Sequence, residues 1–235
     1  MKQTPFRKGL LDGLPIGLGY LSVSFAFGIF AVNSGLSAAE ASMISMTCMT
    51  SAGQLAAVPI MTGGGSVLEL IVSQLVINLR YSLMSISMSQ KLGPDVGTAD
   101  RFAVAFFNTD EIFAVASAQP GLVSRRYLYG LGVLPWVGWA GGTIAGALAG
   151  NILPAIVTDA LGVAIYGMFI AIVVPVAKAE RPVACCVLLA VILSCLFAAV
   201  PALRLIPGGF TVILCALAAS AVMALIAPVE VEVEA

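Results

Sequence analysis

The chain has 235 residues, of which 60% are hydrophobic and 10% charged, and its mean hydropathy is +1.06. Soluble domains are about half apolar and about a quarter charged, so this composition predicts a protein of the lipid bilayer. The formal net charge is −1 and no segment concentrates basic residues, which excludes nucleic acid as an expected partner. The chain contains no histidine, which excludes Ser-His-Asp catalysis and the histidine-based metalloprotease sites.

The five cysteines do not form a pattern that binds metal. Each lies in an apolar run and no two have the Cys-x-x-Cys spacing, so we interpret them as small hydrophobic side chains. We therefore expect no metal site and no cofactor.

Hydrophobic segments of membrane-spanning length follow one another along the whole chain. A bilayer core about 30 Å thick requires about 20 mostly apolar residues per helix. Division at charge clusters and at Gly or Pro predicts an all-α, polytopic membrane bundle with eight spans, or seven as the alternative. The whole chain, 1–235, is interpreted as one transmembrane domain, with a cytoplasmic N-terminal segment at 1–13 and a short acidic tail at 228–235. The eight spans are 14–32, 41–61, 67–89, 102–118, 127–149, 156–176, 183–200 and 210–227.

The positions of the basic residues predict an orientation. With eight alternating spans and a cytoplasmic N-terminus, the outer loops hold only Lys91, Arg101 and Arg204. The positive-inside rule then places both termini in the cytoplasm. The inner loops hold the other seven basic residues named here: Lys2, Arg7, Lys8, Arg125, Arg126, Lys178 and Arg181.

Four glycines recur at every fourth position of the fifth predicted span: Gly138, Gly142, Gly146 and Gly150. A helix face without side chains allows close approach of another helix, either within the chain or from a partner subunit. Leu14-Pro15 and Leu134-Pro135, each with nearby glycines, also suggest an internal repeat of about 120 residues with broken helices.

Polar side chains inside three of the spans are the candidate functional residues. An ionised group at the bilayer centre costs roughly 2.5 to 3.5 kcal/mol, so Arg80, Asp110 and Glu111 each require a partner, a cavity or a function. Consecutive carboxylates point about 100° apart on a helix, so we expect one to pair with Arg80 and the other to face a cavity. Gln54 is interpreted either as a link between helices or as a site contact.

Three other residues have simpler expected positions. Glu69 lies close to the start of the third span, where its carboxylate can reach the lipid headgroups. Trp136 and Trp139 are expected to lie in the aromatic belt at the membrane interface.

The chain resembles the AzlC-type branched-chain amino acid permeases. The resemblance runs from about residue 8 to about residue 176, and one departure is Tyr81, which stands where the family pattern has histidine. The motifs that carry it are, in order, Gly13-Leu14-Pro15, Ser51-Ala52-Gly53-Gln54, Asn78-Leu79-Arg80-Tyr81, Thr109-Asp110-Glu111 and the segment 139–150.

The resemblance implies the large subunit of a two-component exporter of leucine, isoleucine, valine and sometimes methionine. It would act in the bacterial cytoplasmic (inner) membrane by secondary transport, with a small AzlD-type membrane subunit. The residues carried over as candidate substrate or coupling contacts are Gln54, Asn78, Arg80, Asp110 and Glu111.

Three other functions compete with amino acid export. The first is a channel or carrier for another small solute, and the second is an accessory subunit that assembles a larger membrane complex. The third, an intramembrane enzyme, is disfavoured because Asp110-Glu111 has no second deep aspartate in another span and histidine chemistry is absent. We therefore expect no catalytic residues.

Overall fold

The computed structural model describes residues 5–150, 156, 170 and 173–227. Within them the secondary structure is helical, apart from one isolated bridge between Leu92 and Val123. This confirms the predicted all-α class. The elements are α1 (Pro5–Asn33), α2 (Ala38–Thr47), α3 (Ser51–Thr62), α4 (Val67–Ile77), α5 (Leu79–Lys91), α6 (Thr98–Phe107), α7 (Asp110–Ser117), α8 (Arg125–Ala149), α10 (Arg181–Ala199), the short 3-10 turn η1 (Leu203–Leu205) and α11 (Gly208–Ile226).

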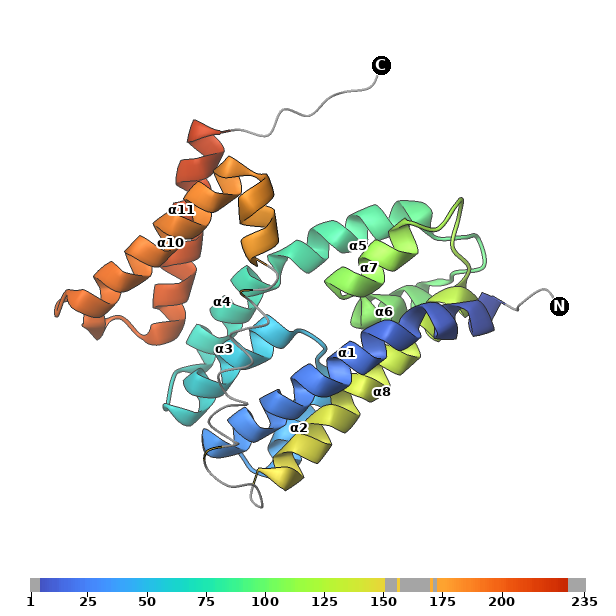
Figure 1. The fold of residues 1–235 in the computed structure, drawn as a ribbon, viewed down its shortest axis with the longest axis horizontal. Coiled ribbons are helices and arrows are strands. Elements are labelled where there is room, and N and C mark those ends of the chain that lie inside the picture. The colour runs from blue at the N-terminus through green and yellow to red at the C-terminus, as the bar shows by residue number, and fades with distance from the viewer. Residues whose placement is uncertain (1–4, 151–155, 157–169, 171–172, 228–235) are drawn as a thin grey trace.

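Two long helices, α1 and α8, lie side by side and form the wall against which α2, α3, α6 and α7 pack (Figure 1). They run in the same direction, because the start of α1 contacts the start of α8 and the end of α1 contacts its end. Gly9 lies against Leu131, for example, and Gly28 against Ala147. Both helices continue through their internal prolines, Pro15 and Pro135, so the predicted interruption at these dipeptides is wrong.

The glycine stripe of α8 faces α1. A methyl group on Gly138, Gly142 or Gly146 would overlap backbone carbonyl oxygens of α1, and Gly150 lies beside Ile29. Gly17 of α1 makes the reciprocal approach, where a methyl group would lie 2.8 Å from the Leu134 carbonyl oxygen. The stripe is therefore used for packing within the chain, and α1 occupies the face that a partner subunit would need.

The second predicted span is a helical hairpin, formed by α2 and α3. Side chains pair across its arms in antiparallel order: Ser45 Oγ donates to Gln54 Oε1 over 3.2 Å, while Ala41 and Val58 share one apolar cluster. At the open end, Gly35 lies close to Thr62. The chain thus enters from the C-terminal end of α1, turns at residues 48–50 and returns to the same end.

The fourth predicted span is a second hairpin, formed by α6 and α7, which enters from the opposite end. Its base is tied by two backbone hydrogen bonds, Gly93 N to Val123 O at 2.8 Å and Val123 N to Lys91 O at 2.9 Å. Lys91 also donates to the Ser117 carbonyl at the end of α7. The turn at Asn108 and Thr109 lies deep in the bundle, beside the start of α5.

Between the hairpins, α4 and α5 form one span that bends by 44° at Asn78. It runs from the base of the first hairpin to the base of the second, opposite in direction to α1. The unit α1 plus α2–α3 is therefore followed by a similar unit, α4–α5 plus α6–α7, of inverted direction. Helix α2 and helix α6 have 10 residues each, and their starts, residues 38 and 98, are 60 positions apart.

The two hairpins also begin alike. The Glu40 carboxylate accepts from Ser37 N at 2.7 Å, and the Asp100 carboxylate accepts from Gly97 N at 3.0 Å. The Ser37 hydroxyl on Glu40 and the Tyr129 hydroxyl on Asp100 hold the pKa of these carboxyl groups below the ordinary range, and the backbone hydrogen bonds add to this effect. The repeat predicted from the prolines at about 120 residues is thus replaced by one of about 60 residues.

The number of spans differs from the sequence prediction. Four described helices, α1, α8, α10 and α11, are long and apolar enough to cross a membrane, and the bent pair α4 and α5 makes a fifth candidate. Most of the predicted span 156–176 and the acidic tail 228–235 lie outside the described residues. The two remaining predicted spans, 41–61 and 102–118, are the hairpins. Their polar centres end the first helix of each hairpin before it crosses the membrane, so the chain returns to the side from which it entered.

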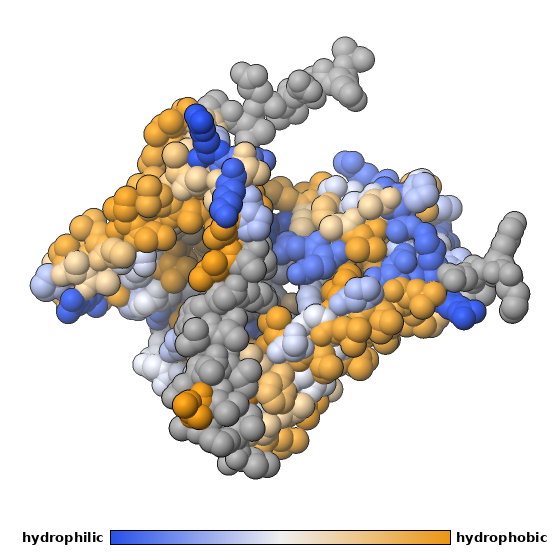
Figure 2. Space-filling model, in the orientation of Figure 1, coloured by the Kyte–Doolittle hydropathy of each residue, from blue (hydrophilic) through white to orange (hydrophobic). Residues whose placement is uncertain are grey.

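Helices α10 and α11 pack on each other, and α11 also packs on α4 and α3, with hydrophobic side chains over most of the surface of the pair (Figure 2). The Glu69 carboxylate joins α11 to α4 by accepting from Gly209 N at 2.8 Å. Glu69 is only 4% exposed, so the prediction that it reaches the headgroups is wrong. A carboxylate at the start of α11 satisfies an orphan amide and is favoured by the helix dipole.

The hairpins make a topology prediction that single-cysteine labelling tests. In a cysteine-free background, Asn33→Cys and Val67→Cys should react with an impermeant maleimide from one side of the membrane, and Pro94→Cys and Leu122→Cys from the other. All four parent residues are exposed at the hairpin bases. Eight alternating spans would instead place 33 opposite 67 and 94 opposite 122, and that labelling pattern would refute the hairpins.

A second prediction concerns the α1–α8 contact. Gly146→Ala should destabilise the protein by about 1 to 3 kcal/mol, because its methyl group overlaps the Phe25 carbonyl. Gly141→Ala in the same helix is the control, since nothing lies within 4 Å of its added methyl group, and better helix propensity should keep it neutral or stabilising. Thermal melting of the detergent-solubilised proteins compares the two, and equal melting temperatures would contradict the packing.

Candidate functional site

A cavity of about 760 Å³ lies where the tips of both hairpins approach the middle of α1 and α8. Ligand pockets typically measure about 300 to 1,000 Å³. One part of its lining is polar and comes from the hairpin tips and α5, and the rest is apolar. The polar lining includes Tyr20, Ser51, Arg80, Tyr81, Thr109, Asp110 and Glu111, and the apolar lining includes Ile16, Val23, Met49, Ile77, Trp139 and Val173.

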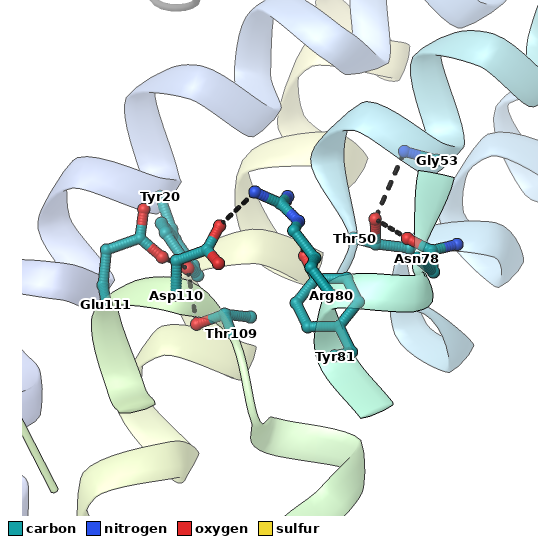
Figure 3. Close-up of polar contacts among 9 residues, drawn as sticks. All are labelled: Tyr20, Thr50, Gly53, Asn78, Arg80, Tyr81, Thr109, Asp110 and Glu111. Atoms are coloured by element: carbon teal, nitrogen blue, oxygen red, sulfur yellow. Dashed lines mark hydrogen bonds and ion pairs between the residues drawn. The ribbon is translucent and has the colours of Figure 1, made fainter. Parts of the chain in front are cut away.

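An ion pair forms part of the lining of this cavity (Figure 3). Arg80 Nη1 lies 2.6 Å from Asp110 Oδ2, which joins the first turn of α5 to the first turn of α7. This confirms that Arg80 pairs with one of the two consecutive carboxylates. Both side chains are nearly half exposed, 47% and 46%, so water screens the pair and its net contribution to stability is small. A pair of this kind can open and offer its charges to a ligand.

The second carboxylate faces α1. The Tyr20 hydroxyl donates to Glu111 Oε2, and Thr109 Oγ1 lies 2.8 Å from the Tyr20 oxygen, to which it can donate. Glu111 is exposed to the cavity and has no described cationic partner. Asp110 and Glu111 thus point to different neighbours, as expected for consecutive helical residues.

Asn78 lies at the bend between α4 and α5 and connects this bend to the first hairpin tip (Figure 3). Thr50 Oγ1 donates to Asn78 Oδ1 over 2.7 Å and accepts from Gly53 N over 3.2 Å. On the other side, Asn78 Nδ2 donates to Gln74 Oε1 over 3.1 Å, and Gln74 donates to the Gly53 carbonyl. The network satisfies the Gly53 amide freed by the break before α3, a requirement at membrane depth, and ties this break to the bend at Asn78.

Gln54 lies away from the cavity, in a fully buried network. Thr143 donates to Ser45 over 2.8 Å, Ser45 donates to Gln54 Oε1, and Gln54 Nε2 donates to the Cys48 carbonyl. The side chain is 1% exposed and does not line the cavity. Of the two interpretations of Gln54, the structure therefore supports the link between helices.

The arrangement can hold a group with two opposite charges. Arg80 and the first-turn amides of α3, at Ser51 and Ala52, attract an anion, because helix N-termini carry partial positive charge and unpaired N–H groups. Glu111 and Asp110 attract a cation. The two charged regions share one cavity with aliphatic and aromatic side chains, so a small zwitterion with an apolar side chain matches its chemistry.

Several lining residues were not identified from the sequence. Tyr20 resembles any interfacial aromatic residue there, and only the tertiary structure brings it to Glu111. Trp139 is 2% exposed and packs against Phe27 and Tyr20, so its predicted place in the aromatic belt is wrong. Thr50 and Thr109 each precede a helix that begins in the middle of a predicted span, and this N-cap pattern was the available signal.

Comparisons with known proteins give the chain a family. The family model described as AzlC protein matches residues 15–153. An uncharacterized membrane protein of Archaeoglobus fulgidus is 35% identical over 187 residues, which cover 77% of this chain and 80% of that protein. The inner membrane protein YgaZ of Escherichia coli is 29% identical over 195 residues, which cover 80% and 78%. No solved structure matches the chain.

The burial of Gln54 predicts that its substitution affects folding. Gln54→Ala should lower stability by about 1 to 3 kcal/mol, because it leaves buried partners such as Ser45 unsatisfied. Gln90→Ala, at an exposed position of α5, should change stability by less than about 0.5 kcal/mol. Melting temperatures of the purified proteins measure this difference, and an unchanged Gln54→Ala temperature would contradict the structural role.

Proposed function

Because the chain belongs to the AzlC family of membrane proteins, we propose that it exports branched-chain amino acids by secondary active transport, binding them in the cavity between the two hairpin tips. The observation that carries this proposal is the meeting of Arg80, Asp110 and Glu111 in one largely apolar cavity. Leucine, isoleucine and valine are zwitterions with aliphatic side chains. Each needs a cationic partner, an anionic partner and an apolar pocket.

Binding would proceed by exchange of partners. The substrate carboxylate takes Arg80 and the first-turn amides of α3, while the ammonium takes Glu111 and the released Asp110. The half-exposed ion pair costs little to open, whereas a dry pair would hold its charges together. The aliphatic side chain then lies against residues such as Ile16 and Met49. The volume of the cavity, about 760 Å³, also leaves room for the side chain of methionine.

The inverted pair of hairpins supports a transport cycle. Secondary transporters often contain inverted repeats, with broken helices whose ends meet the substrate near the bilayer midplane. Here each hairpin tip lies beside the cavity and each hairpin base lies at a different end of the α1–α8 wall. Movement of one hairpin or the other would open the same cavity to opposite sides of the membrane, which is what alternating access requires.

We place the N-terminal end of α1 in the bacterial cytoplasm. Lys8, Lys91, Arg101 and Arg125 gather near this end, because the base of the second hairpin and the start of α8 lie there. Lys91 and Arg101 were assigned to outer loops by the eight-span prediction. The hairpin topology moves them to the side that holds Lys8, so the positive-inside rule favours this orientation more strongly than before.

A small AzlD-type membrane subunit is the proposed partner. Because α1 covers the glycine stripe, the partner would dock elsewhere. The test is leucine efflux from cells loaded with leucine-containing dipeptides, with this chain expressed alone and with the small subunit. Accelerated efflux in either case supports amino acid export, and dependence on both chains supports the partnership. Normal expression of both chains without accelerated efflux would refute the proposal.

Arg80→Ala should reduce leucine efflux at least tenfold, because the substrate carboxylate loses its charged partner; tenfold corresponds to about 1.4 kcal/mol. Arg101→Ala, an exposed arginine at the base of the second hairpin, is the matched control and should retain normal efflux. Expression and melting temperature of both variants are measured in parallel. A well-folded Arg80→Ala protein with normal efflux would contradict the assigned role.

A further inference from the structure

A second, smaller cavity of about 260 Å³ lies between the two hairpin tips. It is lined by the turn of the first hairpin, the bend of α4–α5 and the turn of the second hairpin. Thr47, Thr50, Asn78, Tyr81, Asn108 and Thr109 supply its polar side chains. None of the residues that line it is charged, in contrast to the larger cavity.

Asn108 has an oxygen without a partner. The side chain is 5% exposed and its Nδ2 donates to Ser85 over 3.2 Å, yet its Oδ1 is buried and accepts no hydrogen bond from the described residues. An unsatisfied polar atom at this depth costs about 1 to 3 kcal/mol, so a native protein ordinarily supplies it with a ligand. The observation indicates an occupant that interacts with oxygen atoms.

The other polar groups of the smaller cavity also present oxygen. The hydroxyl of Thr50 already donates its proton to Asn78 Oδ1, which leaves lone pairs on both atoms for a further contact. Thr109 and Tyr81 add two hydroxyl oxygens, although Tyr81 Oη also accepts from Arg80 Nη2 over 3.3 Å and Thr109 Oγ1 lies 2.8 Å from the Tyr20 oxygen. A ring of neutral oxygen atoms suits a monovalent cation, whereas calcium and magnesium sites ordinarily include carboxylates.

The two hairpins direct their helix ends to different cavities, with C-terminal ends at the smaller one and N-terminal ends at the larger one. Residues at the ends of α2 and α6, at 47–49, 105, 106 and 108, line the smaller cavity. The first residues of α3 and α7, including Ser51 and Asp110, line the larger one. Helix C-termini carry partial negative charge and favour cations, so the ends of α2 and α6 favour a cation on their side of the smaller cavity, while the start of α5 lines its other side.

We infer that the smaller cavity binds a monovalent alkali cation, sodium or potassium, whose binding is coupled to that of the transported amino acid. This inference rests on the proposed function for its coupling, while the cation site stands on the geometry alone. The two cavities share Met49, Tyr81 and Thr109. A cation that draws both hairpin tips together therefore fixes the wall of the substrate cavity, and substrate binding favours the same arrangement.

The test is the melting temperature of the purified full-length protein in nanodiscs, followed by tryptophan fluorescence. Sodium chloride or potassium chloride replaces choline chloride at constant ionic strength. We expect the melting temperature to rise and saturate with increasing sodium or potassium concentration, because a ligand that binds only the folded state stabilises it. No rise above choline with either cation would overturn the cation site and leave water as the occupant.

Asn108→Ala should raise the half-saturating cation concentration at least tenfold, and Asn108→Asp should lower it, because a carboxylate strengthens a cation site. Ser85→Ala is the matched control, since it removes the other hydrogen bond of Asn108 without touching the smaller cavity. The half-saturating cation concentration of Ser85→Ala should stay within twofold of that of the parent protein. Equal half-saturating cation concentrations for Asn108→Ala and the parent protein would refute the site.

A second pair of variants covers the case in which Asn108→Ala does not fold. Thr50→Ser keeps the hydroxyl and should retain the response to the cation, and Thr50→Val removes it and should weaken the response at least tenfold. An identical response in both variants would overturn the assignment of Thr50 oxygen to the cation.

Coupling has a separate readout. Leucine at saturating concentration should lower the half-saturating cation concentration at least threefold, and an unchanged value would refute the coupling. Leucine exchange across proteoliposomes, which needs no ion gradient, tests the proposed function independently. Absent leucine exchange with an intact melting response to the cation would refute amino acid transport and retain the cation site. Leucine exchange without a melting response to the cation would retain amino acid transport and refute the cation site.

Discussion

The backbone contact between α1 and α8 is the interaction on which the rest of the structure depends. The two helices approach so closely that their glycines leave no room for a methyl group, and they run in the same direction. In a membrane such packing replaces the hydrophobic driving force that water supplies to soluble proteins. The first arm of each hairpin is attached to this wall: Ser45 to Thr143, Trp136 to the Met46 carbonyl, and Phe107 against Gly132.

A second constraint explains where the polar residues lie. Backbone groups exposed by a broken helix cannot be left to lipid, so breaks at membrane depth occur only inside protein or beside a cavity. The chain has three such breaks among its described residues, at 48–50, at Asn78 and at 108–109. Thr50 donates to Asn78 and also caps the start of α3 by accepting from Gly53 N. The residues that stabilise the breaks therefore lie close to the residues that bear charge.

The sequence predicted the membrane class, the packing role of the glycine stripe and the pairing of Arg80 with one consecutive carboxylate. It did not predict the hairpins, because hydropathy measures only whether a segment is apolar and long. Each hairpin, counted with its turn, has about as many residues as one membrane span. What distinguishes them is contact across the arms, such as Ser45 with Gln54, which spacing alone does not reveal.

A signal for the inverted repeat was nevertheless present. Ser37 with Glu40 and Gly97 with Asp100 mark two helix starts 60 residues apart, counted from residue 37 to residue 97. The prolines at 15 and 135 attracted attention because proline usually interrupts helices. In α1 and α8 they are accommodated, since Pro135 is buried against α1 and each helix continues past it.

The two hairpin tips are similar in shape and different in charge. The tip from the end of α1 presents Ser51 and Ala52, with neutral amides, and the opposite tip presents Asp110 and Glu111. The near-symmetry of the backbone is thus broken by a fixed electric field across the larger cavity. A zwitterion has a dipole that aligns with this field whichever side of the membrane is open. Under the proposed function, such a molecule would pass from one side to the other without tumbling, and a solute of a single charge would gain no comparable alignment.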